Sequence, residues 1–92
     1  MARLSEAGIA AKLAGVLGWR RRGDAIERTW TFDTFVEAVA FMNRVFALAE
    51  EANHHPDLTN SWTKVVLRFT THDAGGLTER DFKMAAKVTR VG

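Results

Sequence analysis

Three histidines are the side chains of this sequence best suited to chemistry, because imidazole exchanges protons near neutral pH. They are the only histidines among the 92 residues, and they fall close together as His54, His55 and His72. Carboxylates flank them at Glu50 and Asp81. Titratable groups clustered in this way indicate a cleft that performs general acid–base catalysis.

The first carboxylate can be paired with a histidine from helical spacing. Residues four apart lie on the same side of a helix, so Glu50 is expected to orient the ring of His54 if the preceding helix extends that far. The negative end of that helix also favours the imidazolium form, typically by about 0.3–1 kcal/mol. We therefore expect His54 to donate a proton, and His55, just past the helix end, to point elsewhere and play another role.

The third histidine, His72, stands where an apolar run opens into an Asp-Ala-Gly-Gly loop, an accessible place for a reactive group. Asp81 lies near the start of the next helix and is close enough in sequence to return to that loop. A capping box with Thr78 also explains Asp81, and for this residue taken alone we favour the structural role.

The first half of the chain is predicted to form a helix, a hairpin and a long helix. Apolar residues at helical spacing favour a first helix over 5–17. Two short strands, within 19–22 and 25–32, flank a Gly-Asp pair that is typical of a hairpin turn. Asp33 or Thr34 then caps the longest helix of the chain.

The long helix is expected to end near residues 52–54, because Pro56 disfavours helical geometry at the residue before it. Its apolar stripe is predicted to pack in the core and consists of Phe35, Val39, Met42, Phe46 and Ala49. The apolar surface is wide enough to leave room for a contact between subunits.

The second half contains the strongest strand signal, over 62–71, where apolar and polar residues alternate. Residues 57–61 before it form a turn or a short edge strand, and a final helix begins after Thr78. This order predicts a single α+β domain over 1–92, in which helices cover one face of an antiparallel sheet.

Composition restricts the function further. The chain has no cysteine, which leaves no thiolate nucleophile, no thiolate metal ligand and no disulfide. We see no signal peptide or membrane span and expect a cytoplasmic protein with no membrane partner. The net charge is only +2, and the one dense basic run, Arg20–Arg22, is expected to be a solvated strand end. Direct binding to nucleic acid is not expected.

The spacing of the candidate residues resembles the signature of the pterin-4a-carbinolamine dehydratase family. Five parts carry it: Glu50, His54-His55-Pro56, Trp62, His72 and Asp81. The resemblance spans nearly the whole chain, and its neighbouring matches are Gly18-Trp19, Asn53, Lys64-Val65, Thr71-His72-Asp73 and Gly75-Gly76-Leu77-Thr78.

This resemblance implies an α-β-β-α-β-β-α fold with a four-stranded sheet, whose third strand is 57–61. It implies a dehydratase that removes water from 4a-hydroxy-tetrahydropterin to give quinonoid dihydropterin. Such an enzyme recycles the cofactor of an aromatic amino acid hydroxylase and needs no metal or organic cofactor. Members of the family form homodimers or homotetramers.

The resemblance also implies a role for each matching residue. His54 and His72 would be the acid–base pair, and His55 would bind and position the pterin. Glu50 and Asp81 would orient the imidazoles. The sixth residue, Trp62, would help wall the cleft.

Two other functions remain open. Three histidines can hold catalytic zinc, although two adjacent ones rarely converge on one ion. The same scaffold could instead serve as a non-catalytic binding, assembly or transcriptional-coactivator protein, but such members are expected to lose parts of the histidine signature that this chain retains.

Overall fold

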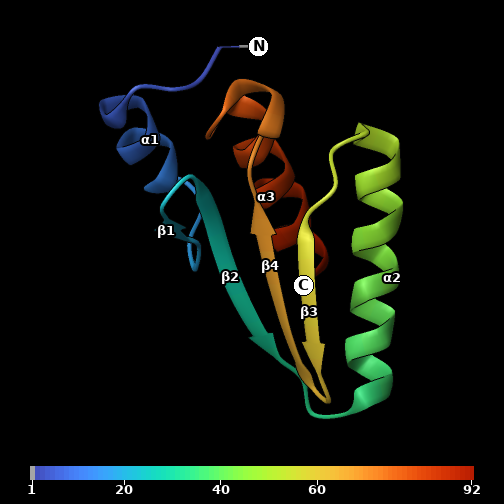
Figure 1. Ribbon diagram of the computed structural model, residues 1–92. Helices are drawn as coiled ribbons and strands as arrows, with labels where there is room; N and C mark the ends of the chain where they lie inside the picture. Colours follow the sequence, from blue (N-terminus) through green and yellow to red (C-terminus); the bar gives the residue numbers. More distant parts are fainter. Residues whose placement is uncertain (1) are drawn as a thin grey trace.

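The structure is a computed structural model that describes residues 2–92. Strand β4 (Lys64–Phe69) is an inner strand of the sheet, and its Val65, Leu67 and Phe69 are completely buried on one face. Strand β2 (Ala25–Thr31) pairs with one edge of β4 and β3 (Asp57–Ser61) with the other. Strand β1 (Arg20–Arg22) pairs with β2, so the antiparallel order is β1-β2-β4-β3 (Figure 1).

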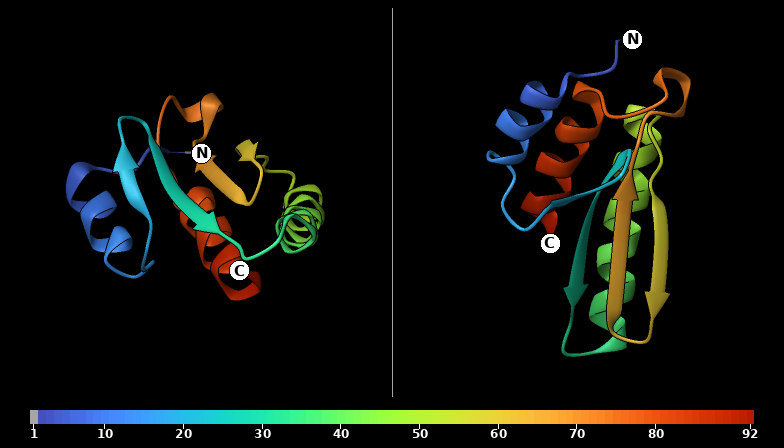
Figure 2. Two further views of the ribbon diagram at one scale, coloured as in Figure 1. Left: turned by 90° about the horizontal axis from the view of Figure 1, so that it is seen from below. Right: turned by 60° about the vertical axis from the view of Figure 1, so that its left-hand side comes forward.

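Helices α1 (Glu6–Leu13), α2 (Phe35–Ala52) and α3 (Glu79–Val91) lie on one side of the curved sheet (Figure 2). A short 3-10 turn, η1 (His72–Ala74), connects β4 to α3. The predicted α-β-β-α-β-β-α order and α+β class are confirmed, including a third strand at 57–61. The first helix is shorter than predicted: it ends at Leu13, and Leu17 is exposed rather than part of it.

Local signals explain where the elements begin and turn. The hydroxyl of Thr34, not Asp33, accepts from the backbone N–H of Glu37 and so caps α2. Gly23 adopts a φ of 60° in the hairpin between β1 and β2, a conformation that glycine reaches without strain. The Arg20–Arg22 run is an exposed edge strand, as expected.

The buried face of α2 differs from the predicted stripe. The residues that face the core are Ala38, Phe41, Met42, Val45 and Ala49. Phe35 and Phe46 are each 49% exposed. Apolar residues surround much of this helix, so periodicity alone does not select one face. Contact with α3 and the sheet decides which face is buried, and the small Ala38 and Ala49 lie on that face.

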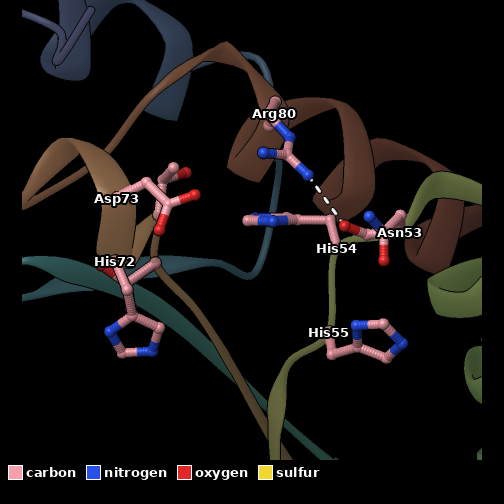
Figure 3. Close-up of a pocket in the computed structure, with 8 residues that line it drawn as sticks. Asn53, His54, His55, His72, Asp73 and Arg80 are labelled. Atoms are coloured by element: carbon pink, nitrogen blue, oxygen red, sulfur yellow. Dashed lines mark hydrogen bonds between the residues drawn. The ribbon is translucent and has the colours of Figure 1, made fainter. Parts of the chain in front are cut away.

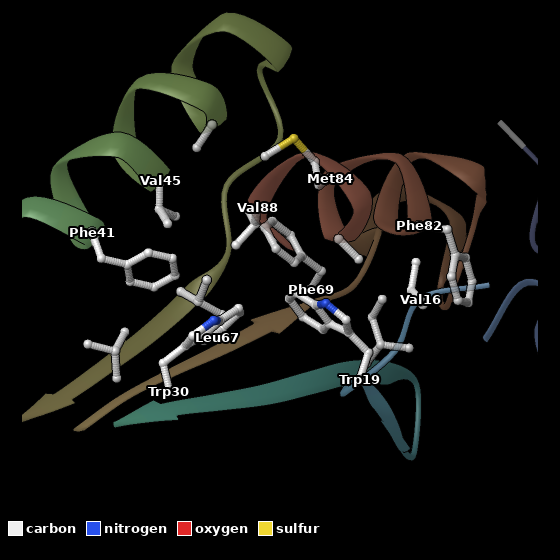
Figure 4. Packing of buried hydrophobic residues seen from close by; sticks show 14 of the residues in the cluster. Val16, Trp19, Trp30, Phe41, Val45, Leu67, Phe69, Phe82, Met84 and Val88 are labelled. Carbon is white, nitrogen blue, oxygen red and sulfur yellow. The ribbon is translucent and has the colours of Figure 1, made fainter. Parts of the chain in front are cut away.

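Aromatic rings from the sheet and helices pack into one core between the layers (Figure 4). Trp19 meets Trp30 edge to face, with their ring centroids 5.6 Å apart, and Trp30 lies against Phe41. The indole N–H of Trp19 donates to Thr89 Oγ1 of α3 at 3.0 Å. These contacts fix α2 against β2 through Trp30 and α3 against Trp19, which precedes β1. No helix in the described part of the chain combines the length and apolar character needed to cross a membrane.

Candidate active site

A cavity of about 210 Å³ opens at the end of the sheet where α2 and β4 both end (Figures 1 and 3). All three histidines of the chain line it. The complete lining is Asn53, His54, His55, Thr70, Thr71, His72, Asp73 and Arg80. The structure therefore brings together the imidazoles that the sequence predicts to share one cleft.

The end of α2 aims the two adjacent histidines in different directions. Asn53 caps the helix in the left-handed conformation, with a φ of 50°. Asparagine tolerates this conformation better than most residues, because its short polar side chain bonds locally. The chain turns sharply there, so that His54 enters the protein with 7% of its surface exposed while His55 stays at the surface.

His54 is held by Asp81, which lies at the start of α3. Its Nε2 is 2.6 Å from Asp81 Oδ1, and its ring stacks against that of Phe69, with centroids 5.9 Å apart. The expectation that Glu50 orients His54 is wrong. Four-residue helical spacing does not apply to this pair, because the helix ends at Ala52 and Asn53 turns His54 away.

Glu50 instead contacts the other member of the pair. Its Oε1 lies 2.7 Å from His55 Nε2, and both side chains are more than half exposed. Exposed ion pairs contribute little to stability, typically less than about 1 kcal/mol. The contact therefore orients the His55 ring at the rim of the cavity more than it stabilises the fold.

Asp81 is completely buried and uses both of its oxygens. Oδ1 faces His54, while Oδ2 accepts from the backbone N–H of Thr78 and from the hydroxyl of Thr71, each at 2.9 Å. The hydroxyls of Thr71 and Thr78 are 2.8 Å apart. Asp81 therefore combines the capping role, which the sequence favours for it, with the orientation of His54.

The Asp81 contact also sets the protonation pattern of His54. An ionised carboxylate only accepts hydrogen bonds, so the neutral ring must carry its proton on Nε2 and donate it. Nδ1 is then an unprotonated acceptor, and it has no hydrogen-bond partner within residues 2–92. Nδ1 is therefore the ring nitrogen of His54 that remains available as a hydrogen-bond acceptor.

His72 approaches the cavity from the opposite side, on η1 (Figure 3). Its side chain is exposed and makes no ion pair within the described residues. Gly75 ends this turn at a φ of 72°, and a bridge between Thr71 and Gly76 closes the loop. His72 is thus an accessible imidazole on a well-defined turn.

Trp62 does not reach the cavity, contrary to expectation. It is 79% exposed and occupies the turn between β3 and β4. That turn lies at the opposite end of β4 from the loop that follows the strand (Figure 1). The ring of Trp62 lies 6.5 Å from that of Phe35 at the start of α2. A strand of six residues separates the two ends of β4, so Trp62 cannot wall this cavity within one chain.

Arg80 and Thr70 line the cavity although neither was singled out from the sequence, and Arg80 makes the more informative contact. Its guanidinium donates to the backbone carbonyl of Asn53 at 2.8 Å and lies beside His54 (Figure 3). It thereby ties the start of α3 to the end of α2. Its position next to Asp81 in the sequence was the only available signal, and adjacency on a helix does not show which side chain turns inward.

The side chains that line the cavity include both hydrogen-bond donors and acceptors. Among residues 2–92, no group of three or more histidine, aspartate or glutamate side chains is positioned to hold a metal. Two of the imidazole rings are oriented by carboxylates, and the third, that of His72, makes no ion pair with any residue that the structure describes.

Comparisons of sequence identify relatives over the full length of the fold. A family model described as pterin 4 alpha carbinolamine dehydratase matches residues 2–91. A protein of Thermomicrobium roseum, provisionally named a pterin-4-alpha-carbinolamine dehydratase, is 54% identical and covers 99% of this chain and 98% of its own. A protein of Thermosynechococcus vestitus with the same provisional name is 46% identical over 97% of this chain and 94% of its own.

Solved structures share the fold. A Brucella melitensis protein, described as a transcriptional coactivator/pterin dehydratase, aligns with a TM-score of 0.93 and 34% identity over 97% of both chains. A pterin dehydratase-like protein, described as a RuBisCO assembly factor of the alpha-carboxysome, aligns with a TM-score of 0.70 and 25% identity, over 80% of this chain and 88% of its own. From the match over residues 2–91 and the close relatives, the chain belongs to the pterin-4-alpha-carbinolamine dehydratase family.

Proposed function

We propose that the chain eliminates water from 4a-hydroxy-tetrahydropterin to give quinonoid dihydropterin. The observation that supports this most strongly is the meeting of three differently held imidazoles around one cavity. Family membership supports the same substrate class. The reaction needs one proton delivered to the leaving oxygen and one removed from the ring, while the flat heterocycle is held in place. Three imidazoles around one cavity can provide these functions.

The contacts suggest how the two protons are handled. Contrary to the expectation from the sequence that His54 donates a proton, we assign it as the acceptor of the proton that leaves the ring, because its Nδ1 is free while Asp81 holds Nε2. His72, on the opposite wall, delivers a proton to the 4a-hydroxyl, which departs as water while the adjacent nitrogen supplies the electron pair. The proton gained and the proton lost balance, so the net change is loss of water. General acid–base assistance of this kind contributes about 10²–10⁴ in rate.

The remaining assignments concern binding and partners. His55, fixed at the rim by Glu50, contacts and positions the pterin. The half-exposed Phe35 and Phe46 of α2 are suited to a homodimer or homotetramer contact. We place the enzyme in the cytoplasm, where it would recycle the pterin cofactor of an aromatic amino acid hydroxylase.

Stopped-flow dehydration of 4a-hydroxy-tetrahydropterin tests this proposal. We expect turnover by the parent protein and a decrease of about 10²–10⁴ in kcat for His54→Ala and for His72→Ala. Lys64→Ala, an exposed substitution on β4, is the matched control and should keep parental turnover. Turnover that neither histidine substitution slows would remove the catalytic assignment. Zinc measured in the purified protein together with activity lost to a chelator would replace it with the metal mechanism.

A second candidate is a binding or assembly function on the same scaffold. The relevant observations are the structural neighbour described as an assembly factor and the exposed apolar residues, which include Trp62 and Val36. An assembly protein should show no turnover and should retain its partner when His54 and His72 are replaced. The intact three-histidine cavity leads us to favour the enzyme.

A further inference from the structure

A second hollow, of about 140 Å³, adjoins the histidine cavity and is strongly basic. Its lining is Ala52, His54, Arg80, Lys83, Met84 and Lys87. It shares the side chains of His54 and Arg80 with the first cavity. The two hollows are therefore neighbours, and Arg80, which lines both, donates to the backbone carbonyl of Asn53 (Figure 3).

The three cations come from one face of α3. Arg80, Lys83 and Lys87 are three and four residues apart, which places them on the same side of the helix. Arg80 and Lys87 are half-buried, while Lys83 is exposed. A shared helix face holds the three charges close together along the hollow.

None of these cations is neutralised by a carboxylate in the described part of the chain. The acidic residues of α3 are engaged elsewhere, since Asp81 contacts His54 and Glu79 pairs with Lys12 at 3.3 Å. On the last turn of α2, Glu50 pairs with His55, and Glu51 makes no ion pair with the basic residues. Partly buried, unpaired positive charges are unfavourable unless something compensates them.

The carbonyl end of α2 compensates part of this charge. The guanidinium of Arg80 donates to the backbone carbonyl of Asn53 at the end of α2. A cation near a helix C-terminus is stabilised by about 0.3–1 kcal/mol. The helix end therefore accounts for the charge of Arg80, but it does not account for those of the two lysines. Lys83 and Lys87 have no hydrogen-bond acceptor within residues 2–92, although both line the hollow.

We propose that this hollow is a subsite for a phosphate-type anion, and that its occupant is a phosphorylated side chain on the pterin substrate. Two lysines and an arginine match a phosphate monoester, which carries up to two negative charges and accepts several hydrogen bonds. The ring occupies the histidine cavity and the phosphate passes Arg80 into the second hollow. The choice of occupant rests on the proposed function, whereas the anion subsite does not.

Fluorescence binding of two stable pterins tests the subsite without catalysis. The probes are 6-hydroxymethylpterin and its phosphate monoester, titrated at constant ionic strength. We expect the parent protein to bind the ester about tenfold more tightly than the alcohol, as charge-assisted hydrogen bonds require. The double substitution Lys83→Ala with Lys87→Ala should abolish this difference and leave the affinity for the alcohol unchanged. Lys64→Ala, which removes one distant positive charge, should preserve it.

Inorganic phosphate, followed by NMR shifts of the α3 amides, distinguishes the source of the anion. Competition of phosphate with the ester but not with the alcohol supports the substrate side chain. Phosphate binding that requires both lysines, with equal affinity for the two pterins, overturns the substrate assignment and makes the site one for a free anion. If the two pterins bind with equal affinity and phosphate shifts no α3 amide, the proposal of an anion subsite is wrong, and the lysines only cover the end of α2. If neither pterin binds yet phosphate does, the proposed function fails while the subsite stands.

Discussion

Replacing Asp81 by asparagine separates two roles that one side chain combines. The substitution keeps the size of the group and leaves an oxygen able to accept from Thr78 and Thr71. The amide nitrogen then faces His54 and donates where the carboxylate accepted. The imidazole must respond by accepting at Nε2 and carrying its proton on Nδ1. A ring in that tautomer cannot take a proton at Nδ1.

The expected sizes of the two effects follow from the contacts. Loss of the proton acceptor removes general-base assistance, so kcat should fall by about 10²–10⁴. The hydrogen bond between residue 81 and His54 changes from a charge-assisted bond to a neutral one, so the fold loses about 1–1.5 kcal/mol. For a chain of this size such a loss lowers Tm by roughly 4–12 °C. The activity loss thus exceeds what partial unfolding alone would produce at low temperature.

The assays are stopped-flow turnover at saturating substrate, urea unfolding, and ¹⁵N NMR of the histidine side chains. The parent protein should show the Nε2–H tautomer for His54, and the variant the Nδ1–H form. Thr71→Val is the matched comparison, since it removes one hydrogen bond to Asp81 Oδ2 and leaves Oδ1 with His54. It should cost about 1 kcal/mol of stability and change kcat by less than about tenfold. A variant at Asp81 that loses the expected stability yet keeps kcat within about threefold would refute the tautomer argument.

Three further predictions concern the surroundings of the site and the surface. Glu50→Gln should change stability by less than about 1 kcal/mol and raise KM rather than lower kcat, because its carboxylate contacts His55 at the rim; urea unfolding and turnover measure both. Asn53→Ala should destabilise the protein by about 1–2 kcal/mol, whereas Asn53→Gly should not, since only alanine is strained at a φ of 50°. The hydrogen bonds and charge of Arg21 lower the pKa of Glu6 below its ordinary value of 4.5. Their contribution is therefore present above that value and lost as the pH falls through the lowered pKa. Urea midpoints measured from neutral to acid pH should fall more in the parent protein than in Glu6→Gln, which lacks this one contribution.

The sequence determined most of the secondary structure by itself, because the decisive signals are local. Pro56 forces the long helix to end before it, and Gly23-Asp24 marks the hairpin. Thr78 and Asp81 form the expected capping box, since that motif depends only on residues three apart. The clustering of His54, His55 and His72 correctly indicated a shared cavity, although chain proximity does not state which atoms meet.

Only the tertiary structure decided the partners of those histidines. Helical spacing predicts that Glu50 contacts His54. Because the chain turns at the left-handed Asn53, His54 instead contacts Asp81, and Glu50 contacts His55. This turn involves a single residue, Asn53, and it changes where the side chains of His54 and His55 point. Helical periodicity does not apply beyond such a turn, so it cannot predict their partners.

The same limit explains the other corrections. The buried face of α2, the distant position of Trp62 and the entry of Arg80 into the cavity all depend on which elements pack together. Local patterns report what a segment can form, because backbone preferences act over a few residues. The contacts that create the site join residues up to 27 positions apart, such as His54 and Asp81, and only the folded arrangement of α2, β4 and α3 brings them within reach.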